Sequence, residues 1–148
     1  MNTPNPNPAG IAVVFGATGG IGKALVAALS RDPRNTEVLG FSRSGPHTFD
    51  LTDEASIAAA AARIAQSGQP LRTVIDATGA LAAEGCIAEK SWRQLDPETM
   101  ARAFQINTIG PALIAKHALP KLRKNDKAIF AALSARVGSI SDNRLGGW

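Results

Sequence analysis

The sequence contains no tyrosine, only one cysteine and no long apolar run, and each absence limits what the chain can do. Because Cys86 is alone, no internal disulfide can form and no cysteine cluster can hold zinc. The histidines His47 and His117 show no spacing typical of metal ligands. No apolar run approaches the length that spans a bilayer. We therefore expect no metal and no membrane insertion, and we predict a reducing, cytoplasmic location.

Aromatic residues make up 5% of the chain, and 16 Lys and Arg against 12 Asp and Glu give a net charge of +4. The densest basic group, residues 121–124, follows a predicted helix. Cations at that position stabilise the C-terminus of a helix. Basic and aromatic residues do not interleave as they do in single-strand-binding proteins. We therefore predict no nucleic-acid partner. A chain of 148 residues, 45% of them hydrophobic, suffices for one globular domain.

Apolar runs and helical patterns alternate after a polar, proline-rich tail at residues 1–10. The expected strands are residues 11–15, 37–41, 47–49, 72–76 and 129–133. The expected helices are residues 21–29, residues 54–66, and a long helix that begins at Asp96 and is kinked at Gly110 and Pro111. This alternation predicts an α/β domain over residues 11–148, with a doubly wound parallel sheet of about five strands in the order 3-2-1-4-5.

The stretch GATGGIG, residues 16–22, joins the first predicted strand to the first predicted helix. In this context Gly16 permits a tight turn, and Gly19 or Gly20 lets the backbone approach a pyrophosphate. Gly22 lets the helix lie close to the sheet, and the helix N-terminus offers N–H groups to phosphates. The alternative is a glycine-rich turn without a ligand. The residues predicted to bind phosphate are Gly16, Thr18, Gly19, Gly20, Ile21 and Gly22.

The residues after the second and third predicted strands bear on the choice of dinucleotide. An acid about 20 residues beyond the glycine loop would bind the ribose of NAD, but residues 40–44 read GFSRS. The guanidinium of Arg43 suits a 2′-phosphate, and Ser42 adds a hydrogen-bonding hydroxyl, so we predict NADP in preference to NAD. The alternative for Arg43 is a solvated loop arginine. Asp50, followed by Leu51, stands where a carboxylate can accept the adenine amino group; the alternative is an aspartate that merely precedes a helix.

These segments resemble the short-chain dehydrogenase/reductase family. GATGGIG is similar to its Gly-x-x-x-Gly-x-Gly cofactor loop, and fits equally the Gly-x-x-Gly-x-x-Gly form of the extended, epimerase-like branch. DLT at residues 50–52 resembles the family's adenine-contacting aspartate. ATGAL at residues 77–81 stands where the Asn-Asn-Ala-Gly signature is expected, with Gly79 as its match, so the resemblance implies that Ala77, Thr78 and Gly79 contact the cofactor. Together the motifs favour the compact, carbonyl-reductase-like branch.

Two later segments resemble parts of the family's catalytic machinery. FQINTIGP, residues 104–111, is similar to the helix whose asparagine main chain holds a water that leads to the catalytic lysine, which implies this role for Asn107. The alternative is an asparagine that fills a polar notch beside the kink. IFAALSARVGS, residues 129–139, resembles the strand that ends in the catalytic serine, although Ala135 occupies the usual position. We favour Ser139, with Ser134 as the alternative.

The family's Tyr-x-x-x-Lys motif, in which tyrosine gives the proton, is not among these residues, and the sequence stops at Trp148. The resemblance therefore implies the cofactor-binding part of an NADP-dependent oxidoreductase acting on a carbonyl or alcohol, truncated, inactive alone, with a sheet incomplete on its C-terminal side. An exposed last strand would favour homo-oligomers. The alternative from a different class is a non-catalytic NADP-binding sensor or scaffold, and a third is a gene fragment without function.

Overall fold

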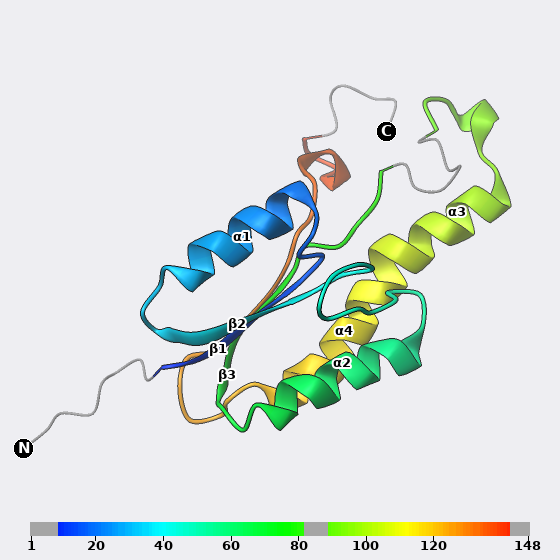
Figure 1. Ribbon diagram of the computed structural model, residues 1–148. Coiled ribbons are helices and arrows are strands. Elements are labelled where there is room, and N and C mark those ends of the chain that lie inside the picture. Colours follow the sequence, from blue (N-terminus) through cyan, green and yellow to red (C-terminus); the bar gives the residue numbers. More distant parts are fainter. Residues whose placement is uncertain (1–8, 82–88, 143–148) are drawn as a thin grey trace, which may run out of the picture.

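The computed structural model describes residues 9–81 and 89–142. Their centre is a four-stranded parallel sheet in the order β2-β1-β3-β4 (Figure 1). The strands are β1 (Gly10–Phe15), β2 (Asn35–Phe41), β3 (Leu71–Asp76) and β4 (Ile129–Ala132). The doubly wound parallel fold predicted from the sequence is thereby confirmed, with one strand fewer.

The strand predicted at residues 47–49 is wrong. Thr48 forms only an isolated bridge to Ser42, because Gly45, at a φ of 118°, and Pro46 turn the chain between them. The segment is held by two backbone hydrogen bonds, from the Ser42 N–H to the His47 carbonyl at 3.1 Å and from the Phe49 N–H to the Ser42 carbonyl at 3.0 Å. The side chain of Phe49 is also buried against the rings of Phe15 and Phe41. A single bridge and the packing of Phe49, rather than a continuous ladder, therefore fix this connection.

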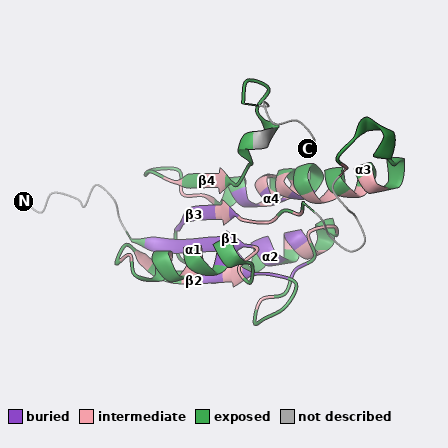
Figure 2. Ribbon diagram, turned by 90° about the horizontal axis from the view of Figure 1, so that it is seen from above, coloured by how far each residue is buried: buried purple, intermediate pink, exposed green. Residues whose placement is uncertain are grey.

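The helices cover both faces of the sheet. They are α1 (Gly20–Ser30), α2 (Glu54–Gln66), α3 (Pro97–Phe104) and α4 (Gly110–Ala118). Short 3₁₀ turns occupy Trp92–Gln94, Leu119–Lys121 and Arg136–Gly138. Figure 1 shows α1 on one face, where it packs on β1 and β2, and α2 beside α4 on the other. β1 is buried along its whole length because it is central and covered on both sides, as Figure 2 shows.

The predicted long helix is interrupted one turn earlier than expected. Asp96 caps α3 by accepting a hydrogen bond from the Thr99 N–H at 2.8 Å, as predicted. A π-helical turn, Gln105–Ile109, then joins α3 to α4. Pro111 has no N–H to donate to the carbonyl of Asn107, which explains why the α-helical pattern fails here.

Candidate cofactor site

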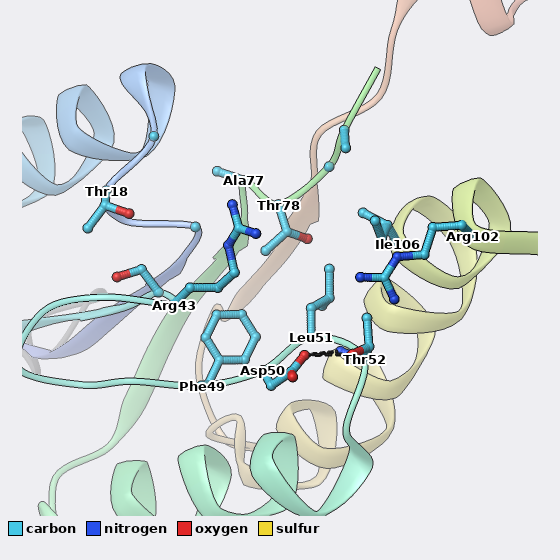
Figure 3. A pocket seen from close by; sticks show the side chains of 15 residues that line it. Thr18, Arg43, Phe49, Asp50, Leu51, Thr52, Ala77, Thr78, Arg102 and Ile106 are labelled. Carbon is cyan, nitrogen blue, oxygen red and sulfur yellow. Dashed lines mark hydrogen bonds between the residues drawn. The ribbon is translucent and has the colours of Figure 1, made fainter. Parts of the chain in front are cut away.

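The carboxyl ends of β1, β2 and β3 meet at one edge of the sheet, because Phe15 stands opposite both Phe41 and Asp76. In parallel α/β sheets, ligands bind at this edge. The segments that follow the three strands, together with α3 and the π-helical turn, surround a pocket of about 510 Å³ (Figure 3). Its lining consists of Gly16, Thr18, Gly19, Ser42, Arg43, Phe49, Asp50, Leu51, Thr52, Ala77, Thr78, Gly79, Ala80, Arg102 and Ile106. Most residues predicted to bind the cofactor are in this set; Gly20, Ile21 and Gly22 are not.

The glycine loop leaves room on one side only. Gly16 has a φ of 81°, and a Cβ on it would lie 2.6 Å from the carbonyl oxygen of Ala77. A Cβ on Gly22 would lie 2.0 Å from the carbonyl oxygen of Gly16, so this glycine lets α1 lie against the loop. A Cβ on Gly20 would meet nothing within 4 Å. No side chain caps α1, so the first N–H groups of this helix receive no hydrogen-bond acceptor from a capping residue.

One end of the pocket is charged. Asp50 Oδ1 accepts hydrogen bonds from the Thr52 N–H at 2.8 Å and from the Thr52 hydroxyl at 2.7 Å. These bonds, helped by the nearby cations of Arg102 and Arg43, hold the pKa of Asp50 below its ordinary value. The carboxyl group is therefore ionised near neutral pH and accepts hydrogen bonds only. The Ser42 hydroxyl donates to the carbonyl of Ser44.

The two arginines reach the pocket from opposite walls. Figure 3 shows Arg43 extending from the end of β2 toward Ala77 and Thr78, and Arg102 reaching from α3 over Thr52. With Asp50, they give the lining one negative and two positive side chains. This surplus of positive charge suits an anionic ligand.

The side chain of Asn107 binds the segment that follows β3 and forms one wall of the pocket. Its Oδ1 accepts a hydrogen bond from the Ala80 N–H at 2.9 Å, and its Nδ2 donates to the Ala80 carbonyl at 2.8 Å. Its Oδ1 would lie 3.3 Å from a Cβ on Gly79, so the side chain sits directly against this wall. The Asn107 side chain therefore positions this wall. Because Pro111 has no N–H, the Asn107 carbonyl oxygen does not receive from it the hydrogen bond that a regular α-helix would provide. The catalytic role that the resemblance implies for Asn107 stays a prediction.

Neither candidate serine lies in the lining of the pocket. Ser134 is exposed beyond the end of β4, and Ser139 is exposed after the Arg136–Gly138 turn, with its Oγ 3.2 Å from that of Ser141. The choice between the two therefore stays a prediction. Ile21, also predicted to bind the cofactor, is not in the lining and is 63% exposed.

Five lining residues were not predicted: Phe49, Thr52, Ala80, Arg102 and Ile106. Arg102 and Ile106 are four residues apart and face the same side of a helical segment. Helical spacing counted back from Asn107 leads to residues 103 and 104 instead, so no signal in the sequence singled out Arg102 and Ile106. Among the described residues, no group of three or more potential metal ligands is found.

Comparison with known proteins agrees with this architecture. A family model described as enoyl-(acyl carrier protein) reductase matches residues 22–144. The chain is 31% identical over 151 residues to dehydrogenase/reductase SDR family member 7B of Mus musculus, a match that covers 88% of this chain and 45% of the relative. It is 32% identical over 98 residues to 1-hydroxy-2-glutathionyl-2-methyl-3-butene dehydrogenase of Rhodococcus sp. strain AD45, over 66% of this chain and 40% of the relative.

Solved structures share the fold. NADPH-bound carbonyl reductase from chicken fatty liver matches with a TM-score of 0.77 and 26% identity, over 93% of this chain and 64% of that chain. The Caenorhabditis elegans protein Sniffer matches with a TM-score of 0.81 and 20% identity, over 95% of this chain and 68% of that chain.

The chain belongs to the short-chain dehydrogenase/reductase family, a family of oxidoreductases. It spans less than half of the length of the two relatives above. No helix in the described parts of the chain is long and apolar enough to cross a membrane.

Proposed function

We propose that this chain binds NADP and forms the cofactor-binding part of an oxidoreductase that acts on a carbonyl or alcohol. The observation that carries the proposal is the pocket itself, where the glycine loop that leads into α1 and the cation of Arg43 meet at the carboxyl ends of three parallel strands. The chicken carbonyl reductase, which is 26% identical, has NADPH bound. A reducing, cytoplasmic location remains a prediction.

The charged end of the pocket suits the adenosine half of NADP. Arg43 would bind the 2′-phosphate, because a guanidinium offers several donors in a geometry that matches phosphate oxygens. Asp50 uses Oδ1 for the Thr52 contacts, so Oδ2 would accept the adenine amino group. Leu51, in the same lining, would provide apolar contact for the base.

The glycine loop suits the pyrophosphate. The open space beside Gly20 lets phosphate oxygens approach the N–H groups at the start of α1, which has no side-chain cap. When bound, the dinucleotide supplies a hydride donor or acceptor at its nicotinamide ring. The wall formed by Ala77, Thr78 and Gly79 would orient that half of the cofactor and exclude water from it.

We expect the 148-residue chain to bind the cofactor without turning substrate over, because it contains no tyrosine to give the proton. In the active protein, Asn107 and either Ser139 or Ser134 would support that group. The second candidate is a non-catalytic NADP-binding sensor or scaffold. The two differ in the protein purified from its natural host: a dehydrogenase oxidises alcohols or reduces carbonyls there, whereas a sensor binds NADPH tightly and does neither.

NADPH fluorescence titration tests the binding. The purified chain should bind NADPH more tightly than NADH, and Arg43→Asp should remove the preference by repelling the 2′-phosphate. Arg93→Asp is the matched control, because Arg93 stacks 4.8 Å from the Trp92 ring centroid, and neither residue lines the pocket. An unchanged NADPH to NADH affinity ratio in Arg43→Asp would refute the role of Arg43. Absence of any NADPH binding by the wild-type chain would refute the proposed function.

A further inference from the structure

Gly110, where the π-helical turn meets α4, is packed directly against the side chain of Leu51. Gly110 is buried, and a Cβ built on it would lie 2.5 Å from Cγ of Leu51, 2.7 Å from Cδ1 and 3.0 Å from Cδ2. Nonbonded carbon atoms pack at about 3.5–4.0 Å, so Leu51 occupies space that any side chain at position 110 would need. Figure 3 shows the side chain of Leu51 rising from this place into the pocket.

Gly110 belongs to a row of residues on one face of the helical segment. Arg102, Ile106 and Gly110 follow one another at intervals of four, a spacing that keeps residues on the same side of a helix. Arg102 and Ile106 both line the pocket. Gly110 continues this face without a side chain, and the resulting recess is filled by Leu51.

The backbone beside Leu51 is anchored to the start of α2. The Asp50 N–H donates a hydrogen bond to Oγ of Ser56 at 2.8 Å, and the Thr52 N–H donates to Oδ1 of Asp50 at 2.8 Å. A methyl group on Gly110 would therefore displace the side chain of Leu51 rather than its backbone. Leu51 packs against the core on one side and lines the pocket on the other, so the displaced side chain finds room only in the pocket.

The conformation of Gly110 does not itself require glycine. Its φ of −55° and ψ of −55° lie in the right-handed helical region, which every L-residue adopts. Alanine is also a better helix former than glycine. The contact with Leu51 is therefore the feature that excludes a side chain at this position.

We propose that Gly110 is a positioning residue of the cofactor pocket, which seats Leu51 and thereby sets the width of the end that receives the adenine base. The inference rests on the proposed function, in which Leu51 contacts the base. Gly110 does not line the pocket and acts only through Leu51. A side chain at position 110 would push Leu51 into the space of the base and leave the glycine loop unchanged.

NADPH titration of Gly110→Ala, in the wild type and in Leu51→Ala, tests this. In the wild type the substitution should raise the Kd for NADPH about tenfold, which is within the range that overpacking costs. Leu51→Ala weakens binding by itself, but it removes the atoms that would clash. Adding Gly110→Ala to Leu51→Ala should therefore change the Kd no further. The matched control is Gly138→Ala, where a Cβ meets nothing within 4 Å, and it should bind like the wild type.

A second titration locates the effect along the cofactor. Adenosine 2′,5′-bisphosphate carries the base and the 2′-phosphate but no nicotinamide. Its affinity should fall in Gly110→Ala by the same factor as that of NADPH. A loss for NADPH without a loss for the bisphosphate would overturn the assignment to the base end.

Unchanged NADPH affinity in Gly110→Ala would overturn the inference and leave the proposed function standing. An equal loss in the wild type and in Leu51→Ala would also overturn it, because the effect would then not pass through Leu51. Urea unfolding reads the same contact without a ligand: Gly110→Ala should cost more stability in the wild type than in Leu51→Ala, and equal costs would contradict the seat. If the wild type binds neither ligand, the proposed function fails, and the role of Gly110 in cofactor binding fails with it.

Discussion

A methyl group at Gly22 should break the packing of α1 against the glycine loop. The Cβ of Gly22→Ala would lie 2.0 Å from the carbonyl oxygen of Gly16, 2.8 Å from its carbonyl carbon and 3.0 Å from the Cα of Ala17. All three obstacles are backbone atoms, so no rotation of a side chain relieves the clash. The glycine loop cannot move away from α1 either, because its other side is packed closely against the segment that follows β3. A Cβ built on Gly16 would lie only 2.6 Å from the carbonyl oxygen of Ala77.

The size of the effect follows from two opposing contributions. Overpacking costs about 1–3 kcal/mol, and a clash with fixed backbone belongs at the upper end. Alanine is a better helix former than glycine by about 1 kcal/mol, which offsets part of the loss. We expect Gly22→Ala to lower the free energy of unfolding by about 2 kcal/mol, a large share of the 5–15 kcal/mol that is typical of a domain.

Gly20→Ala is the matched control, since it adds the same methyl group two residues earlier in the same helix. A Cβ there meets nothing within 4 Å, so the free energy of unfolding should stay equal or rise by up to about 1 kcal/mol. The methyl group would, however, occupy the space beside the start of α1, and NADP affinity should fall. Urea unfolding followed by circular dichroism measures the first effect and NADPH titration the second. Equal stability of Gly22→Ala and wild type would refute the packing argument, and unchanged NADP affinity of Gly20→Ala would refute the placement of the phosphates.

Further predictions concern stability, the charged end of the pocket and the sheet edge. Because burial raises the folded-state pKa of Asp76, the wild type should lose stability as pH rises through that pKa, and Asp76→Asn should abolish this slope in urea unfolding; parallel slopes would contradict it. Asn107→Ala removes both bonds to Ala80 and should cost about 1–2 kcal/mol with weaker NADP binding, whereas full stability would argue against that contact. Arg102→Met should raise the pKa of Asp50, as read by ¹³C NMR, and an unchanged pKa would show that the two charges do not interact. β4 pairs only with β3 among the described strands, so the purified chain should self-associate in static light scattering; a clean monomer would count against pairing through this edge.

The sequence predicted those parts of the fold whose signals are local. Residues 54–66 form a helix as predicted, because alanine-rich sequence and the Asp53 cap agree. The parallel sheet follows from the alternation of strands and helices, and its order confirms the prediction for four strands. Residues 47–49 were misread because an apolar residue beside a turn looks the same in the sequence whether its backbone continues a ladder or, as with Phe49, makes one bond to Ser42 while its side chain is buried.

The same distinction explains which parts of the site could be foreseen. The phosphate loop and Arg43 directly follow strands whose register brings them to one edge, so their convergence follows from the topology. Asp76 carries no such signal, because its burial, and an oxygen without a hydrogen-bond partner among the described residues, depend on the strands beside it. The serines after β4 could not be placed by sequence either, since an irregular loop has no period from which a side-chain direction follows. Sequence reasoning is therefore strongest where a regular element positions a residue, and weakest where only tertiary packing does.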